Sequence, residues 1–103
     1  MIPKKILDFK TISPFFEMCR DGEKPFDIRK IDNADARFRA LFQIRGKENP
    51  QWAIRFTNPA TGEVYMKWLL AWNYLMDHNQ FCVYPSWAIM YLGEPKEATN
   101  DTD

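Results

Sequence analysis

The chain has 103 residues, of which 46% are hydrophobic and 16% aromatic, enough apolar surface for one domain with a single core. Fourteen Lys or Arg residues balance fourteen Asp or Glu residues, so the overall charge does not indicate a polyanionic partner such as duplex DNA. Because residues 1–55 carry twelve basic and eight acidic side chains whereas residues 56–103 carry two and six, an anionic ligand would bind the N-terminal half.

The first expected helix follows an extended segment, Ile6 to Ile12, that is rich in β-branched and aromatic residues. Ser13-Pro14 is a helix-start signature, with Ser as the N-cap and Pro at the first helical position. The pattern predicts a helix of about two turns that ends before Gly22, since glycine favours the left-handed conformation that closes many helices. Its apolar side would carry Phe15, Phe16, Met18 and Cys19.

The next expected element is a strand over Pro25 to Lys30, where apolar and charged residues alternate. This period of two predicts that Phe26 and Ile28 point inward and that Asp27 and Arg29 point outward.

A loop over Ile31 to Arg37 is followed by alternating residues from Phe38 to Arg45, which predict a strand ending at Gly46. Trp52 to Thr57 alternates in the same way, so these two strands are expected to form a hairpin. Asn58 to Gly62 is a strongly marked turn.

The segment from Glu63 to Met76 fits either a buried strand or an apolar helix. We favour a long bent strand because the segment is rich in aromatic residues and lies between two turns, the second over residues 77–80. Extended structure resumes at Phe81, is interrupted at Pro85-Ser86 and closes the domain with Trp87 to Leu92. The expected organisation is one domain over residues 1–93 and a disordered acidic tail over residues 94–103.

No motif indicates a metal, a cofactor or a membrane segment. The longest apolar run, Trp68 to Trp72, is too short to span a bilayer, and the first residues lack the apolar stretch of a secretory signal. Cys19 and Cys82 lie far apart without other Cys or His residues at ligand spacing, which indicates neither a zinc site nor a disulfide framework. This cysteine usage is typical of the reducing cytoplasm. The only histidine, His78, falls in a turn.

The segment from Leu7 to Lys30, LDFKTISPFFEMCRDGEKPFDIRK, resembles the opening of ASCH domains, which belong to the PUA-like β-barrel superfamily. These domains begin with a strand, a short helix and a Gly-x-Lys turn into a strand that carries an acidic or hydroxyl residue, Ile and Arg. The resemblance is greatest to a branch of unknown function that is common in phages and bacteria. The matching residues are Lys10, Pro14, Phe16, Gly22, Lys24, Phe26, Asp27, Ile28, Arg29 and Lys30.

The resemblance implies an α+β, mostly β fold, a small PUA/ASCH-like β-barrel with one short N-terminal helix. It also implies a concave site between that helix and one end of the barrel, lined by Lys24 and Asp27 with Arg29 near them. A small acetylcytidine amidohydrolase of this superfamily uses the turn lysine, a Thr and a later Glu, so Lys24 and Asp27 would be catalytic if this protein is an enzyme. Asp27 stands where that enzyme has Thr, and neither Glu48 nor Glu63 is a clear counterpart of the Glu, so binding without catalysis is the expectation.

Two sets of charged residues are candidate contacts to nucleic acid or another ligand. The first set lies on and just before the predicted strand at residues 25–30, where Lys and Arg could donate to phosphates and a carboxylate could accept from a base amine. Its alternative interpretation is an exposed strand edge with a local ion pair, which contributes little energy. This set consists of Lys24, Asp27, Arg29 and Lys30.

The second set lies along the predicted hairpin, where it would follow a nucleic-acid backbone or simply form the polar side of the hairpin. It consists of Arg39, Arg45 and Arg55, together with Arg37 and Lys47. The large aromatic residues are candidates for base stacking, although at least three of the five are expected in the core. They are Trp52, Tyr65, Trp68, Trp72 and Trp87.

These observations favour binding of RNA, single-stranded nucleic acid or a modified nucleoside. One alternative is a phage-encoded interaction protein directed at a host defence or regulatory protein, with exposed aromatic side chains as anchors. Another is an amidohydrolase acting on acylated pyrimidine nucleosides, which rests on analogy with the superfamily. No cofactor, metal or membrane partner is expected, and both a monomer and a homodimer are compatible with the sequence.

Overall fold

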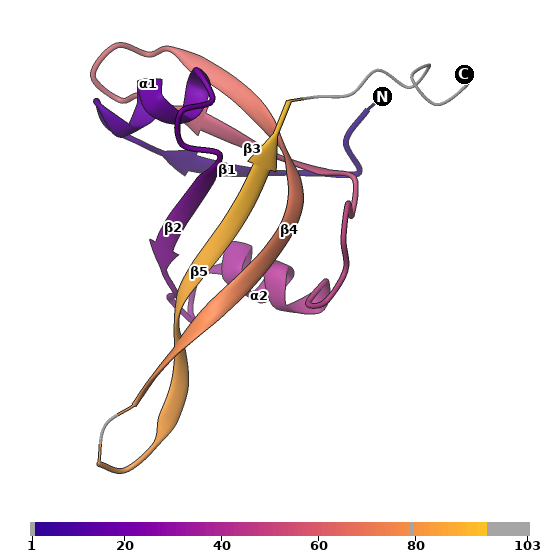
Figure 1. The fold of residues 1–103 in the computed structure, drawn as a ribbon, viewed down its shortest axis with the longest axis vertical. Helices are drawn as coiled ribbons and strands as arrows, with labels where there is room; N and C mark the ends of the chain where they lie inside the picture. The colour runs from indigo at the N-terminus through magenta and orange to yellow at the C-terminus, as the bar shows by residue number, and fades with distance from the viewer. Residues whose placement is uncertain (1, 79, 95–103) are drawn as a thin grey trace.

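The computed structural model describes residues 2–78 and 80–94, which form one five-stranded sheet and two helices. In chain order the elements are β1 (Lys5–Lys10), α1 (Phe15–Arg20), β2 (Phe26–Lys30), α2 (Ala36–Gln43), β3 (Trp52–Thr57), β4 (Val64–His78) and β5 (Val83–Gly93) (Figure 1). The α+β, mostly β class is therefore confirmed. Of the predicted tail at residues 94–103, all but Glu94 lies outside the described residues. No described helix is both long enough and apolar enough to cross a bilayer.

The strands lie in the order β1-β3-β4-β5-β2, so β1 and β2 occupy opposite edges of the sheet. β1 runs parallel to β3, and the other described pairs are antiparallel. The sheet curves strongly, which brings the end of β1 back beside β2 (Figure 1). No backbone pairing among the described strands joins these two edges, but Arg29 Nη1 donates to Lys10 O at 2.8 Å. A side chain therefore bridges the gap between the edge strands.

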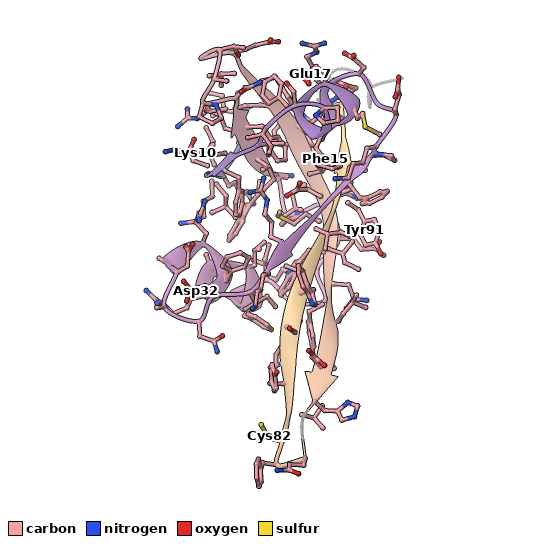
Figure 2. All side chains as sticks on the ribbon, turned by 90° about the vertical axis from the view of Figure 1, so that its left-hand side faces the viewer. Lys10, Phe15, Glu17, Asp32, Cys82 and Tyr91 are labelled. Atoms are coloured by element: carbon pink, nitrogen blue, oxygen red, sulfur yellow. The ribbon has the colours of Figure 1, made fainter. Side chains whose placement is uncertain are left out.

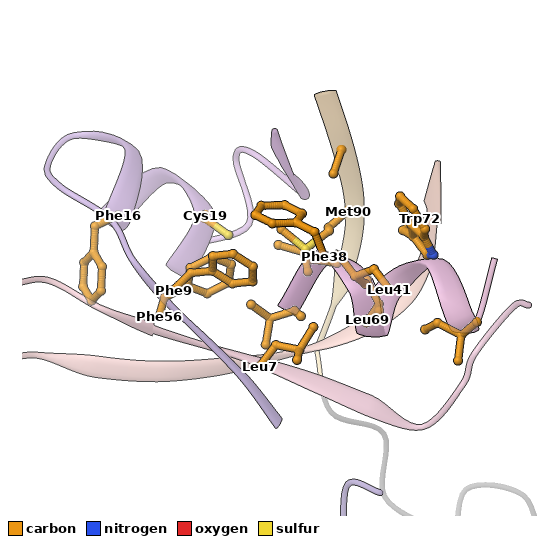
Figure 3. Close-up of a cluster of buried hydrophobic side chains, with 14 residues drawn as sticks. Leu7, Phe9, Phe16, Cys19, Phe38, Leu41, Phe56, Leu69, Trp72 and Met90 are labelled. Carbon is orange, nitrogen blue, oxygen red and sulfur yellow. The ribbon is translucent and has the colours of Figure 1, made fainter. Parts of the chain in front are cut away.

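The hydrophobic core lies on the concave side of the sheet and is closed by both helices. Phe16 and Leu41, from α1 and α2, are fully buried, as is Phe56 on β3. Each such side chain stabilises the fold by about 1.5–3 kcal/mol relative to its exposed state. Figure 3 shows the buried cluster, in which the labelled members are Leu7, Phe9, Phe16, Cys19, Phe38, Leu41, Phe56, Leu69, Trp72 and Met90.

The predicted strand from Phe38 to Arg45 is wrong, because this segment forms helix α2 and its end. Phe38, Leu41 and Ile44 are the buried residues, a spacing of three that places them on one side of a helix. The expected loop at residues 31–37 ends early, since the Asp35 side chain caps the helix by accepting from Arg37 N at 2.9 Å. The predicted hairpin therefore does not exist.

The remaining strands largely follow the sequence pattern. β3 has the predicted bounds, although its partners are β1 and β4. The long strand favoured for Glu63 to Met76 is confirmed as β4, which also includes Asp77 and His78 of the turn expected after it. The turn before β4 contains Gly62 at a φ of 78°. The interruption expected at Pro85-Ser86 does not end the strand, because β5 continues through both residues. The pairing shifts instead: Leu75 of β4 pairs with Trp87, but Met76 pairs with Pro85, so β5 has one extra residue at this point. A register shift of this kind accommodates that residue without breaking the sheet.

The predicted sidedness of β2 is reversed. Asp27 is 6% exposed and Ile28 is 44% exposed, so the acidic side chain faces inward and the isoleucine outward. The inward position is tolerated because Arg29, on the same side of the strand, pairs with the carboxylate at 2.6 Å. Alternation along β2 was therefore predicted correctly, but not the direction in which each residue points.

Candidate functional site

An open hollow of about 380 Å³ lies where the end of β1, the start of α1 and β2 meet. Three residues of the first predicted set, Lys24, Asp27 and Arg29, lie on its wall. Figure 2 views this side of the molecule and labels two further lining residues, Lys10 and Phe15. The complete lining is Lys10, Thr11, Ile12, Phe15, Lys24, Asp27, Ile28 and Arg29.

Arg29 holds the hollow together by joining β2 to the end of β1. Its Nε donates to Asp27 Oδ2 at 2.6 Å, and its two terminal nitrogens donate to Lys10 O at 2.8 Å and Thr11 Oγ1 at 2.5 Å. The guanidinium also lies over the Phe9 ring, 4.9 Å from its centroid. Because all three nitrogens bond to the protein, Arg29 is a fixed part of the wall.

Asp27 lines the hollow with a carboxylate group of which one oxygen is available. Its Oδ2 is occupied by Arg29, while no hydrogen bond to Oδ1 is found within residues 2–78 and 80–94. A buried carboxylate that keeps an acceptor available is suited to a donor group on a ligand, such as an amine.

Lys24 brings a positive charge to the mouth of the hollow. It follows the turn after α1, where Gly22 adopts a φ of 88° and Lys24 N donates to Met18 O at 3.1 Å. Its ammonium lies 5.0 Å from the ring centroid of Phe15 and 5.6 Å from that of Phe26. The half-exposed Phe15 ring therefore lies beside both the cation and the hollow.

The backbone of Ile28 adds a second donor and acceptor pair. Ile31 N donates to Ser86 O at 2.8 Å and Leu92 N donates to Pro25 O at 2.9 Å, so residues 25, 27, 29 and 31 are those that bond to β5. In an antiparallel pair the residues between them point their N–H and C=O groups the other way. Ile28 thus directs both groups to the edge of β2 that no described strand covers, where it lines the hollow.

Cys19 lies buried near this wall but does not supply a nucleophile. Burial is the largest influence on the Cys19 thiol and raises its pKa. The hydrogen bond with Tyr65 offsets part of this increase, and the nearby Asp27 carboxylate adds a smaller one. The thiol is therefore neutral at physiological pH, whereas a nucleophilic cysteine needs its thiolate. The hollow's chemistry consists of hydrogen bonds, the two ammonium groups of Lys10 and Lys24, and an aromatic surface.

The other predicted contacts are not brought to the hollow. Lys30 is exposed on the opposite side of β2, and Arg55 on β3 donates from Nη2 to Asp8 Oδ2 at 3.0 Å. Arg39 lies on α2 and donates to Ala34 O at 3.0 Å, whereas Arg45 is exposed just beyond that helix. The prediction of a basic hairpin face is wrong, because the first of its two strands is a helix. That face was expected to carry Arg37, Arg39, Arg45, Lys47 and Arg55.

The remaining candidates also lie elsewhere. Glu63 pairs with Arg20 at 2.8 Å and Glu48 is in an exposed loop, so neither completes a catalytic set with Lys24 and Asp27. His78 ends β4, far along the hairpin from the hollow's lining residues.

The aromatic candidates lie mostly in the core. Trp68 and Trp72 are buried, Trp52 and Tyr65 are half-buried, and Trp87 is the exposed member. The expectation that at least three of the five contribute to the core is therefore confirmed.

Sequence reasoning missed five of the lining residues, which are Lys10, Thr11, Ile12, Phe15 and Ile28. Phe15 was assigned to the apolar side of α1, yet it is 50% exposed while Phe16 is buried. The Phe15-Phe16 doublet was the available signal, because adjacent helical residues cannot both face the core.

Comparison with known proteins finds no relative: no family model, no curated protein and no solved structure matches this chain. The site must therefore be interpreted from its own geometry. Within the described part of the chain, no group of three or more His, Cys, Asp or Glu residues is arranged to hold a metal ion.

Proposed function

We propose that the hollow binds one base of RNA or single-stranded nucleic acid, or a free modified nucleoside. The observation that carries this proposal is the convergence of Lys24, the available oxygen of Asp27 and the open backbone edge at Ile28 on one hollow. Its volume of about 380 Å³ is near the lower end for small-molecule pockets. This size suits one nucleotide and not a duplex.

Each part of the hollow matches a part of a nucleotide. The exposed face of Phe15 offers a stacking surface, which is worth about 1–3 kcal/mol per base in single-strand binders. Asp27 Oδ1 and the Ile28 backbone offer acceptors and a donor to a base edge that carries an exocyclic amine. Lys24 and Lys10 lie on the wall as donors to the phosphate or the sugar.

The resemblance to ASCH domains supports the same proposal, because the matching segment supplies Lys24, Asp27 and Arg29. The reducing cytoplasm indicated by the cysteine usage is a compartment that contains RNA and free nucleosides. Catalysis is the weaker alternative, since Asp27 is the one acidic residue among the lining residues and no glutamate accompanies it and Lys24 there.

Binding of short RNA and DNA strands and of free nucleosides, measured by calorimetry across salt concentrations, tests the proposal. With two lysines contacting phosphate, the logarithm of the binding constant should fall with the logarithm of salt concentration with a slope of about −1.4. Lys24→Ala should weaken oligonucleotide binding about tenfold and reduce this slope by half. Absence of binding to every strand and nucleoside would remove the proposal.

Asp27→Asn provides the sharper variant. Its amide oxygen can still accept from Arg29, which leaves an NH₂ donor where the wild type offers a carboxylate oxygen. The preference for bases with an exocyclic amine should therefore fall by about 10-fold to 100-fold. Lys47→Ala, at an exposed loop position outside the hollow, is the matched control and should bind as the wild type does.

A further inference from the structure

The sheet has an apolar surface that no described element covers. In antiparallel pairs, directly opposed residues share a face. The register of β2, β5 and β4 therefore gives three rows, Phe26-Tyr91-Ala71, Ile28-Ile89-Asn73 and Lys30-Trp87-Leu75, which we call the outer face. The opposite side of the same strands carries Asp27, Met90 and Trp72, and Phe42 of α2 packs there at 4.9 Å from the Trp72 ring. Figure 2 shows Tyr91 pointing away from the side on which Asp32 and α2 lie.

The outer face is unusual in composition for a solvated surface. Antiparallel sheets with one wet side normally place polar residues on it, yet seven of the nine positions here are apolar or aromatic. Ile28, Tyr91 and Trp87 are 44%, 44% and 42% exposed, and Leu75 is 51% exposed. A contiguous apolar surface of this kind marks an interaction site.

Charge decides what class of partner the outer face fits. Between residues 68 and 95 the sequence contains no Lys or Arg, and Lys30 is the one basic residue of the face. A nucleic acid or an anionic lipid surface would need several cations. A neutral, apolar partner is required, and the chain itself has zero net charge, so two copies do not repel each other.

We propose that the outer face binds the outer face of a second copy of this chain, sheet against sheet, around a two-fold axis parallel to β5. Aligned packing of two sheets is a standard arrangement, and a two-fold axis requires one surface to complement itself. With this axis, β5 lies over β5 of the partner, so Trp87 and Tyr91 meet aromatic side chains of the same rows.

The same axis places β2 of one copy over β4 of the other, and this creates charge complementarity. Lys30 at the end of β2 lies in the row of Leu75, and Asp77 follows two residues later on the same side of β4. Both charged residues are exposed. Each copy's lysine would thus lie over the other copy's Leu75, with the aspartate two residues further along the strand. The long lysine side chain bends to that carboxylate, giving two symmetric ion pairs at the rim of an apolar interface.

Sedimentation equilibrium of the full chain tests the proposal, with a wild-type dimer as the expected result. Trp87→Lys and Tyr91→Lys place a charge in the centre of the interface and should each raise the dimer dissociation constant about 30-fold or more. Val64→Lys, which alters an equally exposed apolar residue outside the outer face, should leave it unchanged. Circular dichroism establishes that each variant is folded.

An exchange of charges keeps the test valid if a lysine variant does not fold. Lys30→Asp should weaken the dimer about tenfold, and the double variant Lys30→Asp with Asp77→Lys should restore it. A wild-type chain that stays monomeric, whatever other proteins it captures, overturns the proposal. A dimer whose dissociation constant is unchanged by both Trp87→Lys and Tyr91→Lys also overturns it. If Lys30→Asp with Asp77→Lys does not restore the dissociation constant of the wild type, the assigned axis is wrong.

Discussion

Arg29 shows how one residue serves both the fold and the candidate site. Backbone pairing does not join β1 to β2 among the described strands, and the Arg29 guanidinium bridges them by bonding to Lys10 O and Thr11 Oγ1. The same group neutralises Asp27, whose side chain is only 8% exposed. Removal of one partner of such a pair leaves an uncompensated buried charge, which costs more than the pair itself contributes.

Arg29→Ala should therefore lower the free energy of unfolding by about 2–3 kcal/mol, less than for a fully buried pair because the Arg29 side chain is 25% exposed. Arg29→Lys should recover only part of this loss, since one ammonium cannot reach three acceptors in the geometry of a guanidinium. Urea denaturation measures both variants. Lys47→Ala is the exposed control, and an equal effect of Arg29→Ala and this control would contradict the bridging role.

At the scale of elements, α2 depends on its cap and its buried side. A helix of eight residues is too short to be stable alone, so burial of Phe38 and Leu41 holds it on the sheet. Asp35 begins it by accepting from Arg37 N, and Nε and Nη2 of the Arg37 side chain donate to the same carboxylate in three contacts. These hydrogen bonds from Arg37 hold the pKa of Asp35 below its ordinary value of 3.8.

The lowered pKa of Asp35 has a defined consequence for stability. The folded state binds this proton more weakly than the unfolded state does, so the stabilisation is complete above pH 3.8 and is lost as the pH falls through the folded value. Asp35→Asn keeps a capping oxygen but cannot titrate, so its stability should fall less steeply over that range than that of the wild type. Denaturation at a series of pH values measures this difference.

Asp35→Ala removes the cap itself and should cost about 1 kcal/mol at neutral pH. Glu48→Gln, in an exposed loop, is the control for removal of an acidic charge. Asp8, whose pKa is lowered mainly by its hydrogen bond to Arg55, titrates in every variant and cancels in the comparison. Parallel pH profiles for the wild type and Asp35→Asn would show that the carboxylate does not act in this way.

At the scale of the whole molecule, the chain consists of a packed body and a projecting hairpin. The end of β4 and the start of β5 extend beyond the rest of the sheet (Figure 1). The buried cluster includes Trp72 on β4 and Ala88 on β5, and of the described residues between them only the half-buried Tyr74 packs against it. The described part of the hairpin tip thus contributes no side chain to the core.

Replacement of residues 77–84 by Asn-Gly, a two-residue turn that suits a hairpin, should change the free energy of unfolding by no more than about 1 kcal/mol. The shortened chain should also bind ligands at the hollow as the wild type does, because none of the lining residues is removed. Thermal unfolding and calorimetry measure the two properties. Loss of cooperative unfolding would show that the hairpin tip belongs to the folding unit.

The sequence alone was sufficient for features that depend on neighbouring residues. Turn chemistry at Asn58 to Gly62 and the aromatic, bounded segment after it predicted the turn and β4, because such preferences act within a few residues. Lys24 and Asp27 were placed on a turn and the following strand for the same reason. For Phe38 to Ile44 the local pattern fitted both a strand and a helix, since apolar residues recur at spacings of two and of three.

Tertiary structure decided which side of each element is buried and which distant residues become neighbours. β1 pairs with β3 across the intervening chain, and the curved sheet then brings Lys10 and Thr11 to Asp27 and Arg29, from which the hollow is built. Tertiary packing also turns the Asp27 side chain inward and the Ile28 side chain outward, the reverse of what their polarity predicts. Alternation along a strand defines two faces, but only packing against the rest of the chain determines which of them is inside.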